Sequence, residues 1–378
     1  MSDTQKHTKP NVPNLRFPGF EGEWESCELG EIAEFSKGAG ISKDQRSSDG
    51  NPCILYGELY TTYLTEIIDE VVSKTNLDPT GLVRSKANDI IIPASGETAI
   101  DISTARCVLQ DDVLLGGDLN IIRLFNQDGR FFSYQLNGVR KKDIARIAHG
   151  VSIVHLHGNA LSHITVNYPS RSEQEKISSL LSLIDQRIAI QNKVIEKYES
   201  LIKALAYEII GKNSANKSLT ECVQCSSSTL KESDLAKKGT VPAYGASGIS
   251  GFTDNALVAG DSILITKDGS GVGSLRYVYG SHSFVGTLNS MTPKEGIYLP
   301  YIYYALQNIC FESYRTGQAI PHIYFKDYGK KVLYCPALDD QKRLVKGLEK
   351  IDSKIDIERA LLQSLYSAKA FLLYSVFI

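Results

Sequence analysis

The chain of 378 residues contains one sequence unit twice, and this duplication limits the folds open to it more than any other feature. Gly150 aligns with Gly317 at a shift of 167 residues, and the same shift holds without a gap as far as Tyr207 and Tyr374. The pairs matched on the way include Ile153 and Ile320, His155 and His322, Pro169 and Pro336, Gln174 and Gln341, and Ile184 and Ile351. Because the period is so long, it indicates a duplicated domain rather than a solenoid of short repeats.

The matched segment has the apolar spacing of a long helix. From Ile177 onward, apolar residues recur at alternating intervals of four and three, which is the seam pattern of a coiled coil. Each helix would contain about forty residues and extend roughly 60 Å. Two such helices in one chain most simply pack antiparallel, whereas a packing helix inside each domain seldom keeps so many heptads in register. The predicted seam residues are Ile177, Leu181, Ile184, Ile188 and Ile195 in the first helix and Leu344, Leu348, Ile351, Ile355 and Leu362 in the second.

The segments outside the helices indicate α+β structure. Short apolar runs such as residues 53–56, 89–92 and 262–266 are bounded by turn residues, as expected of β-strands, with short helical stretches between them. We therefore predict two globular domains of mixed α/β structure, separated by two long antiparallel coiled-coil helices and related by a pseudo-two-fold internal repeat. The predicted divisions are a flexible tail at residues 1–14, a globular domain at 15–170, a long helix at 171–211, a second globular domain at 212–337 and a second long helix at 338–378.

No group of residues in the sequence has the composition and spacing of a catalytic or metal site. The glycine-rich stretch at residues 269–274 lacks the third glycine of a dinucleotide fingerprint, which favours an ordinary flexible hairpin. Cys222 and Cys225 would supply only half of a zinc site, and the histidines at positions 149, 155, 157 and 163 have no accompanying carboxylate pair. We expect no catalytic residue and no bound metal.

Charge and cysteine content exclude some classes of protein. Lys and Arg number 41 and Asp and Glu 43, so the formal net charge of −2 argues against a small protein that holds nucleic acid by bulk charge. The seven cysteines are scattered without framework spacing, and no segment has the features of a signal peptide or a membrane span. We expect a cytoplasmic protein with free thiols.

The remaining functional signal is a recognition surface. Each globular domain carries basic and aromatic residues on predicted loops and strands, the residue types that neutralise phosphates and reach base edges. Any single one is more often a solvated surface charge, but a set in both copies favours a two-part recognition protein. The candidate DNA-binding residues are Lys37, Lys43, Arg46, Arg84, Lys86, Arg106, Arg140, Lys141 and His155 in the first domain and Lys267, Arg276, Tyr277, Arg315, His322, Tyr324 and Lys326 in the second.

Several motifs follow one another in a fixed order along the chain. Residues 15–24 read Leu-Arg-Phe-Pro-Gly-Phe-Glu-Gly-Glu-Trp, and a Leu-Gly-Glu-Ile stretch follows at residues 29–32. Gly-to-His stretches occur at 150–155 and 317–322, and Pro-x4-Gln motifs at 169–174 and 336–341. In this order the motifs resemble the specificity subunit of type I restriction–modification systems, and residues 15–24 are similar to the opening of many Gram-positive members. The resemblance covers essentially the whole chain, and its specificity lies in the order of the motifs.

The resemblance implies that each globular domain is a target-recognition domain, which reads one half of a split, asymmetric sequence in double-stranded DNA. The long helices would set the gap between the half-sites and dock two modification subunits, which are adenine methyltransferases. Restriction subunits would join for cleavage. Catalysis and the use of S-adenosylmethionine, ATP and Mg would then belong to those partners, and this chain would bind no cofactor of its own.

Two other functions are compatible with the sequence. A duplicated coiled-coil scaffold could bind proteins through its globular parts, and an enzyme could use the glycine-rich loop at residues 269–274.

The near-neutral charge further implies that basic residues gather on one concave face, with acidic residues on the helices and the outer surface. It also implies that the isolated chain binds DNA weakly.

Overall fold

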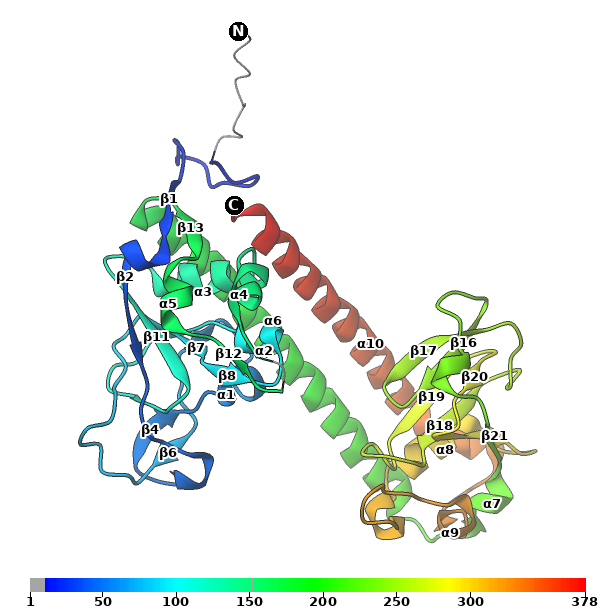
Figure 1. Ribbon diagram of the computed structural model, residues 1–378. Helices are drawn as coiled ribbons and strands as arrows, with labels where there is room; N and C mark the ends of the chain where they lie inside the picture. The colour runs from blue at the N-terminus through cyan, green and yellow to red at the C-terminus, as the bar shows by residue number, and fades with distance from the viewer. Residues whose placement is uncertain (1–10, 151) are drawn as a thin grey trace. The chain divides into compact units, whose positions relative to one another are not determined.

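The computed structural model describes residues 11–150 and 152–378, which their internal contacts divide into two units. Unit 1 consists of Met1–Gln191 together with Leu361–Ile378, and unit 2 is Asn192–Ala360. Each unit therefore contains one globular part and one section of each long helix (Figure 1). Of the predicted tail at residues 1–14, positions 1–10 lie outside the described residues.

The globular part of unit 1 is built on a five-stranded sheet. Its order is β2 (Ala33–Lys37), β11 (Leu119–Leu124), β7 (Asp89–Pro93), β9 (Arg106–Val108) and β5 (Ile67–Ile68). Neighbouring strands are antiparallel except for β9 and β5. All residues of β7 are buried, because this central strand with three consecutive isoleucines is covered on both faces.

Smaller elements surround this sheet. A second sheet has the order β10 (Leu114–Leu115), β4 (Asn51–Ile54), β6 (Lys74–Thr75) and β3 (Arg46–Ser47). Two-stranded pairs join β1 (Glu25–Glu28) to β13 (Thr165–Tyr168) and β8 (Ser95–Gly96) to β12 (Val154–His155). The short helices are α1 (Glu58–Thr61), α2 (Ala99–Ile102), α3 (Gly129–Asn137), α4 (Lys141–Ile147) and α5 (Gly158–Ser162), with 3-10 turns at Leu29–Glu31 and Lys43–Gln45.

The main sheet of unit 2 repeats that of unit 1. Its order is β15 (Val223–Ser227), β21 (Leu288–Pro293), β18 (Ser262–Thr266) and β19 (Leu275–Val278), antiparallel throughout. This is the order and direction of β2, β11, β7 and β9, so the sequence repeat extends to the sheets. The remaining elements are a sheet of β17 (Gly248–Thr253), β16 (Val241–Gly245) and β20 (Ser283–Phe284), the pair β14 (Lys217–Ser218) and β22 (Val332–Leu333), the helices α7 (Leu219–Cys222), α8 (Leu299–Leu306) and α9 (Phe325–Tyr328), and 3-10 turns at Glu232–Asp234 and Phe311–Tyr314.

Two long helices carry the heptad pattern. They are α6 (Arg171–Ala206), which continues into a π-helical turn at Tyr207–Gly211, and α10 (Leu338–Ser375). In unit 1 Asp185 of α6 pairs with Lys369 of α10 at 2.6 Å, and in unit 2 Glu199 pairs with Arg359 at 2.7 Å. Because the later residue of α6 meets the earlier residue of α10, the two helices run antiparallel. The prediction of two mixed α/β parts with two long, packed helices is confirmed.

The predicted seam residues differ in burial. Those that are buried are Ile177, Leu181, Ile188, Ile195, Leu348 and Ile355. Those that are half-buried are Ile184, Leu344, Ile351 and Leu362. Next to Leu344, Val345 is fully buried instead.

A buried glutamine fixes the start of each long helix to its own globular part. In unit 1 the Gln174 side chain accepts the backbone N–H of Asp128 at 3.0 Å and donates to the carbonyl of the proline five residues earlier at 2.8 Å. In unit 2 Gln341 makes the same pair of bonds, to the N–H of Tyr298 at 2.9 Å and to its own preceding proline at 2.8 Å. The repeated Pro-x4-Gln motif therefore joins helix to globular part in both units.

The end of α10 and the residues that follow it belong to the core of unit 1. The ring of Phe131 lies 5.7 Å from that of Trp24 and 5.1 Å from that of Phe377, and all three side chains are buried. The backbone N–H of Leu15 also donates to the carbonyl of Ser375 at 2.9 Å. Both long helices are thus part of the unit's hydrophobic interior.

Candidate nucleic-acid interface

Each unit carries a histidine on a turn that is held in the same way. In unit 1 the backbones of His149 and His155 exchange two hydrogen bonds, of 2.9 and 2.7 Å, and in unit 2 Thr316 and His322 exchange bonds of 2.9 and 2.8 Å. The glycine after the first residue of each turn has a positive φ, 132° in unit 1 and 83° in unit 2, a conformation that favours glycine. The Gly-to-His stretches matched in the sequence are therefore equivalent turns.

A second ring stacks on this histidine in each unit. His157 lies 6.5 Å from His155 with the two planes 9° apart, and Tyr324 lies 6.5 Å from His322 with the planes 22° apart. The rings of His155 and His157 are exposed, and those of His322 and Tyr324 are 36% and 49% exposed. Flat, accessible rings can stack on or hydrogen-bond to an extended partner.

In unit 2, charged residues surround the stacked pair. Nδ1 of His322 donates to Asp268 at 2.6 Å, and Nζ of Lys267 lies 3.4 Å from the other oxygen of that carboxylate. Nζ of Lys326 lies 5.2 Å from the ring centre of Tyr324. Because Asp268 engages Nδ1, the Nε2 atom of His322 is the ring nitrogen left for an outside partner. We call Lys267, Asp268, His322, Tyr324 and Lys326 the unit-2 cluster.

A stacked arginine is a further feature of unit 2. The guanidinium carbon of Arg276 lies 5.8 Å from the ring centre of Tyr244, and both side chains are half-buried. An arginine held flat on an aromatic ring keeps its forked donors ordered, which suits bidentate contacts to a base or a phosphate.

Unit 1 has a concave surface with a volume of 810 Å³ beside β3, β4 and α1. Its lining includes Lys43, Gln45, Arg46, Tyr56 and Tyr60, and we call these five residues the unit-1 pocket. Nη1 of Arg46 lies 3.5 Å from Glu58, whose carboxylate also accepts the N–H of Leu55 at 2.9 Å. Basic, amide and aromatic groups in one concavity fit the edges and backbone of nucleic acid.

Four other candidates are exposed outside these sets. Lys37 ends β2, Lys86 precedes β7, and Arg84 faces Asp112 at 3.7 Å. Arg315 pairs with a neighbouring glutamate at 2.8 Å. Their positions permit phosphate contacts, because a weak surface ion pair is easily exchanged for another.

Arg106 requires a correction, because it lies inside unit 1. Its side chain is 7% exposed, and Nε donates to the backbone carbonyls of Leu59 and Tyr63 at 3.1 and 2.9 Å. Burial lowers the pKa of its guanidinium. Its donors satisfy buried carbonyls, so this arginine supports the fold and is not available to DNA.

Three more candidates are engaged within the protein. Arg140 donates to the carbonyl of residue 378 at 2.8 Å, and Lys141, whose pKa is lowered by burial, lies 3.4 Å from a threonine hydroxyl. The hydroxyl of Tyr277 donates to Asp261 at 3.1 Å and lines an acidic cavity. We leave these three residues out of the proposed interface.

Sequence reasoning missed several residues that the structure adds to the basic candidates. Gln45, Tyr56 and Tyr60 join the unit-1 pocket, and Tyr244 lies beneath Arg276. The four-residue spacing of the two tyrosines was the only local signal, since it places both on one side of a helical turn.

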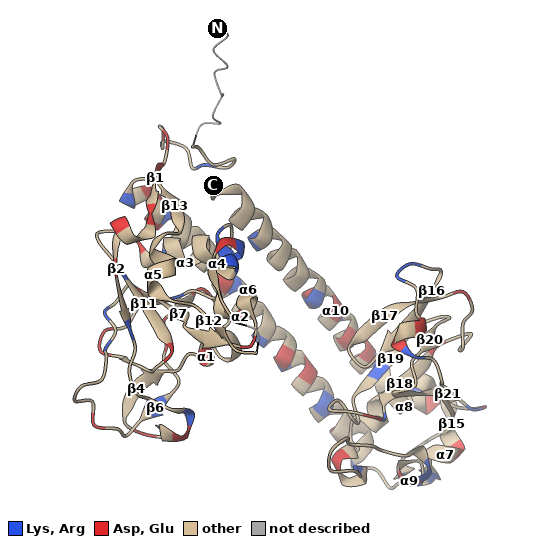
Figure 2. Cartoon of the chain, in the orientation of Figure 1, with Lys and Arg blue, Asp and Glu red and all other residues tan. Residues whose placement is uncertain are grey.

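The described chain has neither a metal-binding cluster nor a membrane-spanning helix. Among residues 11–150 and 152–378, no group of three or more His, Cys, Asp or Glu side chains is placed to hold a metal ion. No helix in that part of the chain is long and apolar enough to cross a bilayer. Figure 2 shows acidic as well as basic residues over both units and along α6 and α10.

The fold and these surfaces define a protein with two similar recognition units joined to long paired helices. The sequence matches the family model of the type I restriction modification DNA specificity domain twice, at residues 21–200 and 212–366. The chain therefore belongs to the family of type I restriction–modification DNA specificity subunits, which are non-catalytic and bind no cofactor themselves. The resemblance inferred from the sequence motifs is confirmed.

Solved structures share this fold. The S subunit of a type I restriction–modification system from M. genitalium is 20% identical, with a TM-score of 0.63 over 97% of this chain and 99% of that one. A chain from a structure described as the structural basis of complex assembly and conformational transition of the type I R-M system is 15% identical, with a TM-score of 0.53 over 95% and 97% of the two chains. A search of curated proteins gives no match.

Proposed function

We propose that this DNA specificity subunit reads a bipartite, asymmetric site in double-stranded DNA, with one half-site for each unit. The observation that carries the proposal is the equivalent histidine turn in the two units, set among different side chains. A shared framework with different surfaces suits two half-sites of different sequence. The unit-1 pocket and the unit-2 cluster are the surfaces that we assign to base and phosphate contacts.

The domain divisions are part of this proposal. Residues 15–170 and 212–337 would be the target-recognition domains, and residues 171–211 and 338–378 the spacer helices. The bounds of α6 and α10 support these divisions, and so do the two glutamine anchors at the helix starts. An anchored helix would hold the half-site gap at a fixed length.

The long helices also carry a repeated exposed apolar residue. Ile190 and Ile357 are matched by the shift of 167 residues, and they are 53% and 62% exposed. An isoleucine left exposed at the same place in each copy fits a docking point for a partner. We assign one modification subunit, an adenine methyltransferase, to each point, with restriction subunits joining for cleavage. S-adenosylmethionine, ATP and Mg would act in those partners.

The docking assignment is tested by Ile190→Asp and Ile357→Asp, alone and together, in complexes with the modification subunits. Each single variant should lose one modification subunit, and the double variant should lose both, as measured by native mass spectrometry. Lys193→Asp, which changes an exposed residue of α6, is the control. A full complement of modification subunits on the double variant would contradict the assignment.

We also place the protein in the cytoplasm. All seven cysteines lie in the described residues and are free thiols, as a reducing compartment requires. The proposed DNA substrate is found in the same compartment.

The decisive experiment exchanges residues 219–335 for the matching segment of a relative and maps methylated adenines in cells by sequencing. One half of a gapped, two-part motif should change while the other half and the gap stay the same. The unmodified gene and a strain that lacks it are the controls. A methylated motif that survives the exchange unchanged would favour the alternative function, a coiled-coil scaffold whose globular parts bind proteins.

A further inference from the structure

In unit 1 a lysine neutralises a buried carboxylate on α6. Oδ2 of Asp185 accepts the hydroxyl of Tyr134 at 2.6 Å, and Oδ1 lies 2.6 Å from Nζ of Lys369. The same ammonium bonds to Glu66 at 2.6 Å and lies 5.6 Å from the ring centre of Tyr134. The Asp–Tyr pair of unit 1 is therefore an occupied ammonium site, in which charge and an aromatic ring both contribute.

Unit 2 repeats the Asp–Tyr pair without the ammonium. Asp352 follows Asp185 by 167 residues, and Tyr304 on α8 follows Tyr134 on α3 by 170. The hydroxyl of Tyr304 donates to Oδ2 of Asp352 at 2.5 Å, as its counterpart does in unit 1. The residue that matches Lys369 is Ile202, which is buried and carries no charge.

The charge of Asp352 is left without an ion pair in the described part of the chain, and its Oδ1 accepts no hydrogen bond there. The charge of Arg359 acts on Asp352 from a distance, but its guanidinium pairs with Glu199 at 2.7 Å and with Asp356 at 3.7 Å. Burial raises the pKa of the Asp352 carboxyl, which shows that its surroundings disfavour the negative charge.

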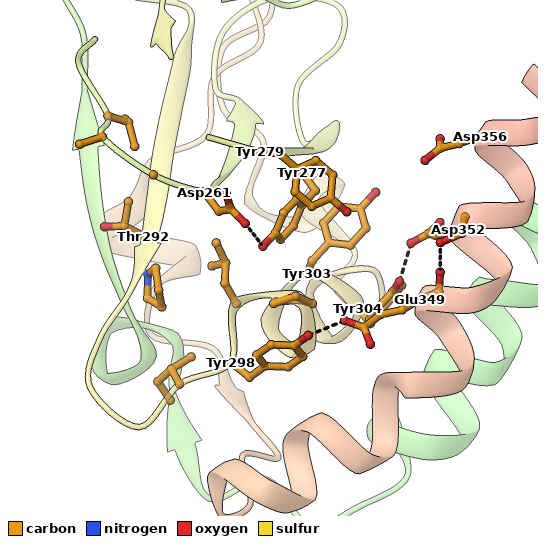
Figure 3. A pocket seen from close by; sticks show the side chains of 18 residues that line it. Asp261, Tyr277, Tyr279, Thr292, Tyr298, Tyr303, Tyr304, Glu349, Asp352 and Asp356 are labelled. Atoms are coloured by element: carbon orange, nitrogen blue, oxygen red, sulfur yellow. Dashed lines mark hydrogen bonds between the residues drawn. The ribbon is translucent and has the colours of Figure 1, made fainter. Parts of the chain in front are cut away.

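Asp352 and Tyr304 line a cavity of 680 Å³ within unit 2 (Figure 3). Carboxylates and phenol rings dominate its walls, and no Lys, Arg or His is among the described residues that line it. The hydroxyl of Tyr298 donates to Glu349 at 2.6 Å, and that of Tyr277 donates to Asp261 at 3.1 Å. The lining carboxylates are Asp261, Glu349, Asp352 and Asp356, and the rings are Tyr277, Tyr279, Tyr298, Tyr303 and Tyr304.

We propose that this cavity binds an alkylammonium cation from outside the chain, beside the Asp352 carboxylate, which has no lysine partner of the kind that Lys369 provides in unit 1. Four carboxylates exclude an anionic ligand such as a nucleotide, and the aromatic walls favour an organic cation over a hydrated metal ion. The volume lies in the range of small-molecule sites and exceeds what a single ion needs. Asp261 and Asp352 come from different elements, so a chain with several ammonium groups can reach both.

Two kinds of molecule carry such an alkylammonium group: a free polyamine and a partner protein with an exposed lysine side chain. Isothermal titration of the full chain with spermidine and with N-acetyl-lysine methylamide, at constant ionic strength, distinguishes them. MgCl₂ is the control for a non-specific cation effect. We expect saturable binding of one molecule for each chain by at least one of the two probes.

The carboxylate of Asp352 is tested by Asp352→Asn, which keeps an oxygen for the Tyr304 hydroxyl but removes the charge. Binding should weaken about tenfold or more, since a charge-assisted hydrogen bond is lost. Asp339→Asn makes the same change at an exposed position of α10 and should leave binding unchanged. Glu349→Gln, which also keeps its tyrosine bond, is a second variant should Asp352→Asn fold poorly.

The possible results distinguish the two sources of the cation and also test whether the cavity binds a cation at all. Saturable binding of spermidine that Asp352→Asn or Glu349→Gln weakens identifies a free polyamine. If only the lysine amide binds saturably, and the variants weaken that binding, the ligand is a lysine side chain of a partner protein. Binding of neither probe, equal binding of MgCl₂, or equal affinity in the variants and the wild type would overturn the proposal.

Discussion

Asp185 and Asp352 occupy the same position of the repeat in two different electrostatic settings. At Asp185 the ammonium of Lys369 offsets the cost of burying the carboxylate, and a tyrosine hydroxyl satisfies its second oxygen. At Asp352 the hydroxyl of Tyr304 donates the hydrogen bond, no cation pairs directly with the carboxylate in the described chain, and desolvation raises the pKa of the carboxyl. The same structural element thus stabilises unit 1, and in unit 2 it is part of the ligand site that we propose.

Replacing Lys369 with Met should destabilise unit 1 strongly. Removal of the ammonium leaves Asp185 and Glu66 buried without their cation, which costs about 3–5 kcal/mol. Urea unfolding followed by circular dichroism measures this difference. Lys193→Met, at an exposed position of α6, should lie close to the wild type. Equal stability of the two variants would contradict the role of the buried cluster.

The pH dependence of the Lys369 contribution has a definite sign. Burial alone would lower the pKa of this lysine, but Glu66 and Asp185 raise it above 10.5 overall. A cation with a raised folded-state pKa contributes its full stability below its unfolded pKa and loses it as the pH rises through the folded value. The stability gap between wild type and Lys369→Met should therefore shrink as the pH rises above 10.5.

Asp352→Asn should have the opposite effect on stability at neutral pH. The carboxyl has a raised folded-state pKa, so its contribution is present below the unfolded value of 3.8 and is lost as the pH rises through the folded value. The variant without the charge should be more stable than the wild type at pH 7, and the difference should vanish below pH 3.8. Thermal unfolding at the two pH values measures it, and a less stable variant at pH 7 would contradict the unpaired state of Asp352.

At the scale of elements, the sequence predicts the long helices, because their formation depends on local periodicity. The heptads of α6 and α10 are readable because one helix face is buried at regular intervals, as at Ile188 and Ile355. Arg106 could not be placed in this way, because its burial depends on carbonyls more than forty residues earlier in the chain. The aromatic cavity was equally hidden, since its walls come from strands, loops and α10.

The seam itself can be tested by charge insertion. Ile188→Asp and Ile355→Asp each place a carboxylate at a buried position, which costs several kcal/mol when no partner is available. We expect loss of cooperative thermal unfolding and of assembly with the modification subunits, measured by circular dichroism and size-exclusion chromatography. Lys193→Asp on the exposed face of α6 is the matched control. Equal tolerance at all three positions would argue against packed helices.

At the scale of the whole molecule, the total charge says little about where DNA binds. The chain carries 41 basic and 43 acidic residues, and acidic side chains lie on both long helices (Figure 2). The acidic cavity of unit 2 shares no lining residue with the unit-2 cluster. In the proposed function, recognition depends on small local sets of basic and aromatic residues rather than on a broad basic face.

Such small sets predict weak DNA binding by the isolated chain. Few phosphates are neutralised, so little counterion release drives association, and we expect a Kd on the order of 10⁻⁴–10⁻⁶ M at physiological salt. The modification subunits add contacts to DNA, so the complex should bind the sequence that it methylates with a Kd on the order of 10⁻⁸ M or tighter. Fluorescence anisotropy over a series of salt concentrations measures both affinities, with a duplex of scrambled half-sites as the control. Nanomolar, sequence-specific binding by the isolated chain would show that its own surfaces suffice for recognition, and the division of labour between the subunits would then be wrong.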